Sequence, residues 1–99
     1  MAIILHYKPD KSDLIRDILD YWDPCRARNT NEWYALYYNY EAETIAQTLR
    51  KNSKPETAAK NVKKLIDRKL ELDGKEYRVD MENATRVTAA MIAAVKGMK

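Results

Sequence analysis

The chain has 99 residues, of which 45% are apolar and 33% are charged, and its net charge is +3. This length suits one domain with a single core, and the apolar content excludes a disordered chain. No apolar run approaches the roughly 18 residues of a membrane-spanning helix, and a single cysteine excludes an internal disulfide. We therefore expect no membrane contact and an intracellular protein, cytoplasmic or nucleoid-associated.

The first predicted elements are a short strand and a helix. Residues 2–7 (AIILHY) are mostly apolar and predict a strand. Ser12 is a predicted N-cap for a helix over 13–22, which ends before Pro24 because the residue preceding a proline avoids helical angles. The apolar residues of this helix recur at steps of three and four: Leu14, Ile15, Ile18, Leu19 and Trp22.

Reactive and metal-ligating side chains in this half are isolated. His6 is the only histidine and Cys25 the only cysteine, and we expect a buried or incidental thiol rather than a nucleophile. Asp13, Asp17 and Asp20 share one side of the helix, but their spacing matches no known metal motif, so they predict an acidic solvent face. No catalytic residue, metal site or cofactor is predicted.

Residues 32–40 (EWYALYYNY) allow two interpretations. Their aromatic content favours a strand, which is the interpretation we prefer. Trp33, Leu36, Tyr37 and Tyr40 also share a helical face, which leaves a helix open. Exposed tyrosines on the strand could stack on bases.

Two helices joined by a short turn are predicted over 41–69. Ala42, Ile45, Ala46 and Leu49 form the apolar stripe of the first. Ser53 and Glu56 have the spacing of a capping box for the second, which begins near Pro55. The buried face of the second helix contains Ala58, Ala59, Val62, Leu65, Ile66 and Leu70.

The opposite face of the second helix is basic and polar. Its residues are Thr57, Lys60, Asn61, Lys64 and Arg68, with Lys54 just before the helix. Such side chains can bind phosphates and hydrogen-bond base edges in the major groove. Taken alone, the same pattern also describes an ordinary solvated face.

A β-hairpin is predicted over 70–79. Leu70, Leu72, Tyr77 and Val79 alternate with polar residues around Asp73-Gly74, a pair that favours a type I′ turn. Lys75 and Arg78 would lie on this hairpin.

A helix-turn-helix over 41–69 followed by a hairpin over 70–79 resembles the winged-helix family of DNA-binding domains. The resemblance covers residues 12–79 and rests on element order, since the turn at 50–54 lacks the glycine often found there. It implies an α+β fold in which the second helix enters the major groove and the hairpin is the wing. The residues implied to contact DNA are Lys54, Thr57, Lys60, Asn61, Lys64, Arg68, Lys75 and Arg78.

The distribution of charge agrees with this interpretation. Residues 1–49 contain 5 Lys/Arg and 8 Asp/Glu, whereas residues 50–78 contain 10 Lys/Arg and 5 Asp/Glu. The basic excess therefore coincides with the predicted helix and wing. A last helix over 84–98 carries a stripe of small apolar residues, which could close the core or form the seam of a homodimer, and we favour the dimer.

The sequence thus predicts one non-enzymatic domain (1–99) that binds double-stranded DNA, specifically or generally, as a small transcriptional or replication regulator. Two alternatives remain open. One is a single-stranded nucleic-acid binder that uses the aromatic strand 33–40. The other is a small accessory or inhibitor protein that binds another protein.

Overall fold

Helices are the only regular secondary structure in the part of the chain that the structure describes. The computed structural model describes residues 10–27 and 34–98, and none of them lies in a strand. Its elements are α1 (Lys11–Trp22), α2 (Tyr34–Tyr37), α3 (Asn39–Thr48), α4 (Pro55–Leu72) and α5 (Met81–Lys96). The α+β fold and the winged-helix resemblance inferred from the sequence are therefore wrong. The strand predicted over 2–7 lies outside the described residues.

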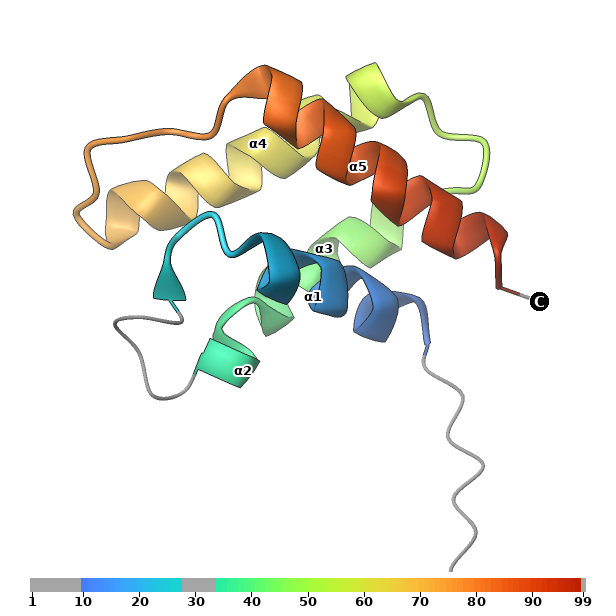
Figure 1. Ribbon diagram of the computed structural model, residues 1–99, viewed down its shortest axis with the longest axis horizontal. Helices are drawn as coiled ribbons and strands as arrows, with labels where there is room; N and C mark the ends of the chain where they lie inside the picture. Colours follow the sequence, from blue (N-terminus) through green and yellow to red (C-terminus); the bar gives the residue numbers. More distant parts are fainter. Residues whose placement is uncertain (1–9, 28–33, 99) are drawn as a thin grey trace, which may run out of the picture.

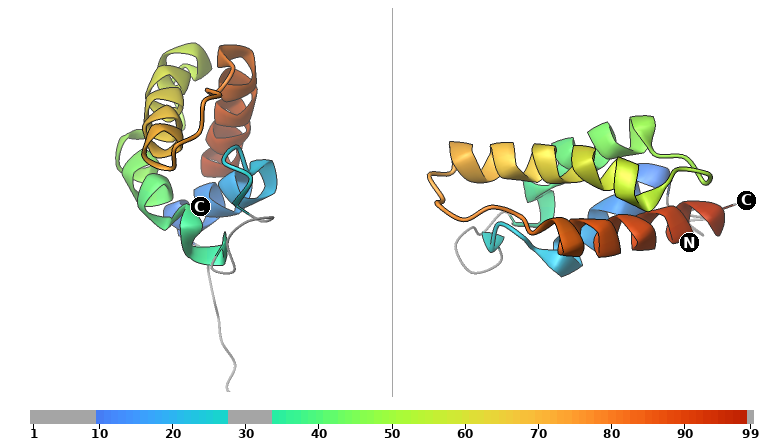
Figure 2. Two further views of the ribbon diagram at one scale, coloured as in Figure 1. Left: turned by 90° about the vertical axis from the view of Figure 1, so that its left-hand side faces the viewer. Right: turned by 90° about the horizontal axis from the view of Figure 1, so that it is seen from above.

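The four longer helices form two packed pairs. α4 packs on α5, and α1 packs on α3 beneath them (Figure 1). α1 also contacts α5, and α3 contacts α4, so the two pairs enclose one core (Figure 2). Each of these helices runs in the opposite direction to the one before it in the chain (Figure 1).

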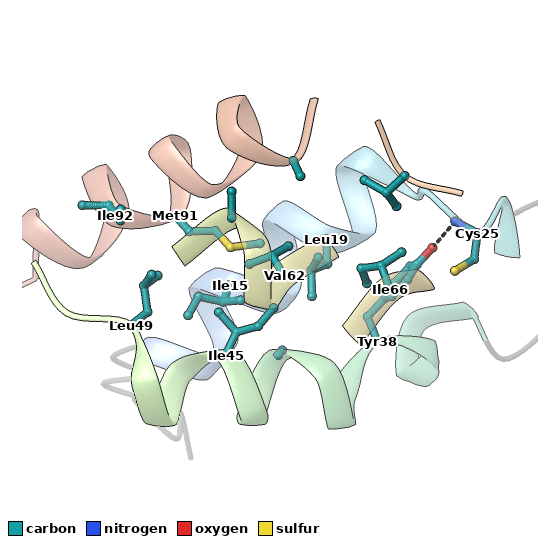
Figure 3. Packing of buried hydrophobic residues seen from close by; sticks show 14 of the residues in the cluster. Ile15, Leu19, Cys25, Tyr38, Ile45, Leu49, Val62, Ile66, Met91 and Ile92 are labelled. Atoms are coloured by element: carbon teal, nitrogen blue, oxygen red, sulfur yellow. Dashed lines mark hydrogen bonds between the residues drawn. The ribbon is translucent and has the colours of Figure 1, made fainter. Parts of the chain in front are cut away.

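The core is built from the apolar stripes that the periodicity predicted. Ile15 and Leu19 of α1 meet Ile45 of α3, Ile66 of α4 and Met91 of α5 (Figure 3). Each of these side chains is buried. Burial of one large aliphatic side chain stabilises a fold by about 1.5–3 kcal/mol, so these stripes determine where the helices pack.

The apolar stripe of α5 belongs to the same core. Ala84 and Met91 are fully buried, and Val87 and Val95 pack against the core with part of their surface covered. The structure begins this helix at Met81, one turn before the predicted start, because the Asp80 side chain accepts a hydrogen bond from the Asn83 N–H.

The predicted hairpin is wrong because α4 continues through its first half and ends at Leu72. The Gly74 N–H donates to the Glu71 carbonyl and the Lys75 N–H to the Leu70 carbonyl, which is the Schellman pattern of a helix C-terminus. Gly74 has a φ of 73°, the left-handed conformation that this motif requires. Asp-Gly thus ends a helix here instead of turning a strand.

Replacing Gly74 by alanine should lower the free energy of unfolding by about 1 kcal/mol, because alanine is strained at positive φ. No atom lies within 4 Å of the position that a Cβ would occupy, so the cost should come from the backbone conformation alone. Gly97→Ala is the control, since Gly97 has a φ of −73° and a Cβ there would make only ordinary contacts. Urea unfolding of both variants measures the difference. An equal effect at the two glycines would contradict this explanation.

From Tyr34 onward the aromatic segment forms α2 and the start of α3, separated by a turn at Tyr38, so the preferred strand over 32–40 is wrong for these residues. Tyr38 faces the core and is 1% exposed, whereas Leu36 and Tyr40 are exposed. The buried face continues one and two turns later with Ala42 and Ile45. Of the face that the helical alternative proposed, Tyr37 packs against the core, whereas Leu36 and Tyr40 do not.

The Tyr38 hydroxyl holds the segment that follows α1. It accepts a hydrogen bond from the Cys25 N–H at 2.9 Å (Figure 3). It also donates one to the Asp23 carboxylate at 2.8 Å. Asp23 Oδ1 also accepts the Ala27 N–H. Burial raises the pKa of the Cys25 thiol to about 11, so this side chain stays protonated at neutral pH. The prediction of a buried, unreactive cysteine agrees with this environment.

Two predicted helix caps were placed on the wrong residue. α1 is capped by Asp10, whose carboxylate accepts the Asp13 N–H, while Ser12 only donates its hydroxyl to Asp10. α4 starts after Lys54 without a side-chain cap. The Ser53 hydroxyl instead accepts the Arg50 N–H and so stabilises the turn between α3 and α4.

Candidate functional site

The predicted DNA-contacting residues of α4 lie together on one exposed face. Thr57, Lys60, Asn61, Lys64 and Arg68 are all exposed, and Lys54 is exposed just before the helix begins. Steps of three and four along a helix place side chains on the same side. We call these six residues the basic face of α4. α4 lies at a corner of the bundle, with α5 on one side and α3 on another (Figure 2).

The cations of this face differ from their neighbours in how their charge is balanced. Lys63 lies 2.5 Å from Asp67, and Lys69 lies 3.3 Å from Glu41. Within residues 10–27 and 34–98, no ion pair is formed by Lys54, Lys60, Lys64 or Arg68. The carboxylates of α3 and α4 thus neutralise the inward-facing lysines and leave the outward-facing cations available to an external anion.

Lys75 and Arg78 do not form a wing. They lie in the extended connection between α4 and α5, where the Arg78 guanidinium donates to the backbone carbonyls of Lys75 and Tyr77. Lys75 is half-buried. The structure therefore does not present these two cations on a hairpin as the sequence predicted.

This connection is fixed to α4 by the pair of Lys63 and Asp67. The Val79 N–H donates to Asp67 Oδ1 at 2.7 Å, and Lys63 Nζ donates to the Val79 carbonyl at 2.8 Å. Both backbone groups of one loop residue are thus satisfied by side chains of α4, and the Val79 side chain is buried. Lys63 is consequently held by the fold and is not part of the basic face.

A groove between α3 and α4 was not predicted from the sequence. Its volume is about 580 Å³. Apolar side chains from both helices line it: Ile45, Leu49, Ala58, Val62 and Leu65. Thr44, Thr48 and Ser53 border it from the α3 side, and Lys54, Thr57, Asn61, Lys64 and Arg68 border it from the α4 side. No Asp or Glu is among these lining residues. We call this feature the α3–α4 groove.

Tyr37 and Tyr38, two of the aromatic residues predicted to stack on bases, are engaged within the fold, whereas Tyr40 is exposed. Tyr38 is buried, and the Tyr37 hydroxyl donates to the Asp73 carboxylate. Lys69 Nζ lies 4.1 Å from the centre of the Tyr37 ring and also pairs with Glu41. These contacts join the start of α3 to the end of α4. Trp33 lies outside the described residues.

The acidic side of α1 contains its own counter-charge. Arg16 lies 3.5 Å from Asp13 and 3.8 Å from Asp17. Among the described residues, no group of three or more His, Cys, Asp or Glu side chains could hold a metal ion. None of the described helices combines the length and apolar character needed to cross a membrane.

Comparison with known proteins gives no family assignment. No protein-family model matches the chain, and neither the curated proteins nor the solved structures contain a match. The candidate sites are therefore the basic face of α4 and the α3–α4 groove, as defined by their geometry alone.

Proposed function

We propose that the protein is a double-stranded DNA-binding module that places the basic face of α4 in the major groove and has no wing. The observation that supports this proposal is the set of four exposed cations on one face of α4 with no ion pair in the described part of the protein. Lysine and arginine in this arrangement can neutralise phosphates, and the release of counterions from DNA then favours binding.

The dimensions and chemistry of α4 fit this role. Its 18 residues give a length of about 27 Å, and the major groove is wide enough to admit an α-helix. Thr57 and Asn61 lie between the cations. A hydroxyl and an amide at these positions can hydrogen-bond base edges while the lysines bind the backbone.

One copy of the protein carries the whole proposed contact surface. The apolar stripe of α5 that could have formed a homodimer seam is used in the core, so the proposal does not require a dimer. In this role the protein is a binding module without catalytic activity, and it acts inside the cell where duplex DNA is present.

The salt dependence of binding tests this proposal. With about four phosphate contacts, affinity for duplex DNA should fall roughly 100-fold between about 50 and 200 mM monovalent salt. Fluorescence anisotropy with a labelled duplex of about 20 base pairs measures this fall, and the single strand of the same sequence is the control. Equal affinity for the single strand, or duplex affinity that does not change with salt, would contradict the proposal.

A further inference from the structure

The α3–α4 groove combines an apolar interior with a rim that is entirely neutral or positive. Ile45, Leu49 and Val62 are buried at its base, and Ala58 and Leu65 are partly exposed along it. Beyond the proposed DNA binding, we propose that this groove binds an acidic amphipathic helix of a partner protein. The proposal stands on the shape and charge of the groove and does not depend on DNA binding.

The length of the groove favours a helix over a small molecule. On the α4 side its lining runs from Lys54 to Arg68, which corresponds to about 21 Å at the rise of an α-helix. About four turns of a partner helix would match this length. An amphipathic helix places apolar side chains at i, i+3, i+4 and i+7, and two parallel walls made of α3 and α4 suit such a stripe.

The charges around the groove select an acidic partner. Lys54 lies at one end, and Lys64 and Arg68 lie toward the other. No carboxylate among the lining residues balances them, and they form no ion pair within the described residues. Complementary charge of this kind determines which partner binds and how fast it associates, while burial of the apolar stripe supplies most of the affinity.

Exposed apolar side chains extend the surface at one end of the groove. Tyr40, which is 69% exposed, lies one helical turn before Thr44 on α3. Leu72, which is 79% exposed, lies one turn after Arg68 on α4. The contact of Tyr37 with Asp73 shows that the start of α3 adjoins the end of α4, so both side chains belong to the same end. Exposed tyrosine and arginine together are typical of interface residues that carry much of the binding energy.

Binding in the groove and binding of DNA would compete. Lys54, Lys64 and Arg68 belong both to the rim of the groove and to the basic face of α4. A partner helix that covers them would remove three of the four cations available to DNA and leave Lys60. Lys60 is exposed on the same face but does not line the groove. A substitution of Lys60 therefore distinguishes DNA binding from binding of a partner helix in the groove.

A labelled peptide of about 18 residues, with leucines at i, i+3, i+4 and i+7 and glutamates beside them, is the probe for this site. By fluorescence anisotropy we expect it to bind at least about 10-fold more tightly than a scrambled peptide of equal composition or a peptide with lysines in place of the glutamates. The scrambled peptide lacks the apolar stripe and so tests whether the apolar interior of the groove contributes to binding. The lysine peptide has the opposite charge and so tests the contribution of the basic rim.

Three variants of the full chain locate the site. Thr48→Trp adds a neutral bulky side chain at an exposed lining position and should weaken peptide binding roughly 10-fold without changing DNA affinity. Lys64→Glu with Arg68→Glu should reverse the preference, so that the lysine peptide binds better than the glutamate peptide. Lys60→Glu should leave peptide binding unchanged and weaken DNA binding. Circular dichroism confirms that each variant is folded.

Several outcomes would overturn the proposal. If the glutamate peptide and the scrambled peptide bind equally well, the protein recognises only the charge of the peptide. If neither Thr48→Trp nor Lys64→Glu with Arg68→Glu changes peptide binding, the peptide binds outside the groove. Binding of dodecanoate with no binding of the glutamate peptide would assign the groove to a lipid. Concentration-dependent self-association that Thr48→Trp abolishes, again without peptide binding, would assign it to a second copy of the chain.

Discussion

Reversing the charge of Lys60 and Lys64 together is expected to lower the affinity for duplex DNA by at least roughly 100-fold at about 100 mM salt. Each substitution removes a phosphate contact and adds a repulsive charge in its place. The slope of log affinity against log salt should also become shallower by about 2, because about one counterion is released per contact. Fluorescence anisotropy over a salt series measures both quantities.

The matched control carries the same change in net charge on another helix. Arg86 and Lys96 are exposed on α5, so Arg86→Glu with Lys96→Glu alters the total charge equally and leaves α4 intact. We expect this control to keep most of the DNA affinity and the original salt slope. If the α5 variant loses as much affinity as the α4 variant, binding depends on net charge and the basic face of α4 is not the contact surface.

Replacing Lys69 by alanine is expected to lower the free energy of unfolding by about 3 kcal/mol. Glu41 is only 6% exposed, and Lys69 lies 3.3 Å from its carboxylate. Removing the lysine leaves a buried carboxylate without its ionic partner and removes the cation that lies over the Tyr37 ring. The remaining exposure of the Lys69 side chain lets some water reach the site, so the cost should lie at the lower end for a buried pair. Urea unfolding with a constant m-value measures the effect.

The double variant Lys69→Met with Glu41→Met is the control for this interpretation. Replacing both partners by apolar side chains of similar size should be much less destabilising than removing the lysine alone, because no buried charge is left unpaired. If the two variants lose equal stability, the loss comes from packing and not from the carboxylate. The test is independent of DNA binding, because neither residue belongs to the basic face.

Helical periodicity located the four longer helices because apolar spacing of three and four has the same meaning in any helical fold. The buried faces of α1, α3 and α4 follow it directly, as Ile15, Ile45 and Ile66 show. Helix ends were harder to place. Asp10 caps α1 where Ser12 was predicted, and Asp80 caps α5 about one turn before its predicted start. Only the local backbone decides between such neighbouring positions.

The α+β fold was predicted wrongly because two local sequence patterns are each compatible with a strand or with a helix. Asp73-Gly74 supplies a residue with positive φ, which both a hairpin turn and a helix C-terminus require. The alternation of Leu70, Leu72, Tyr77 and Val79 suggested two strands, yet Leu70 and Leu72 both lie on α4, where Leu70 is buried and Leu72 is exposed. Tyr38 likewise favours a strand by composition but is buried at the junction of α2 and α3. Tertiary packing overrides such preferences.

The basic face of α4 could be predicted because it lies on one helix. The α3–α4 groove could not, because it requires Thr44 and Leu49 on one helix to lie opposite Thr57 and Leu65 on the next. Sequence periodicity identifies which side of each helix is apolar but not how closely two helices approach. From the sequence, the residues that line the groove could be assigned only to two separate helices.

The packing of helices in consecutive pairs also bears on how the chain folds. α1 with α3, α3 with α4, and α4 with α5 are neighbours along the chain as well as in space, and α1 with α5 is the pairing that joins its two ends. Proteins dominated by such local contacts fold within microseconds to milliseconds, because only short loops must close before native contacts form. Docking of α1 on α5 closes the longest loop, and it therefore carries the largest single loop-closure cost in reaching the native topology.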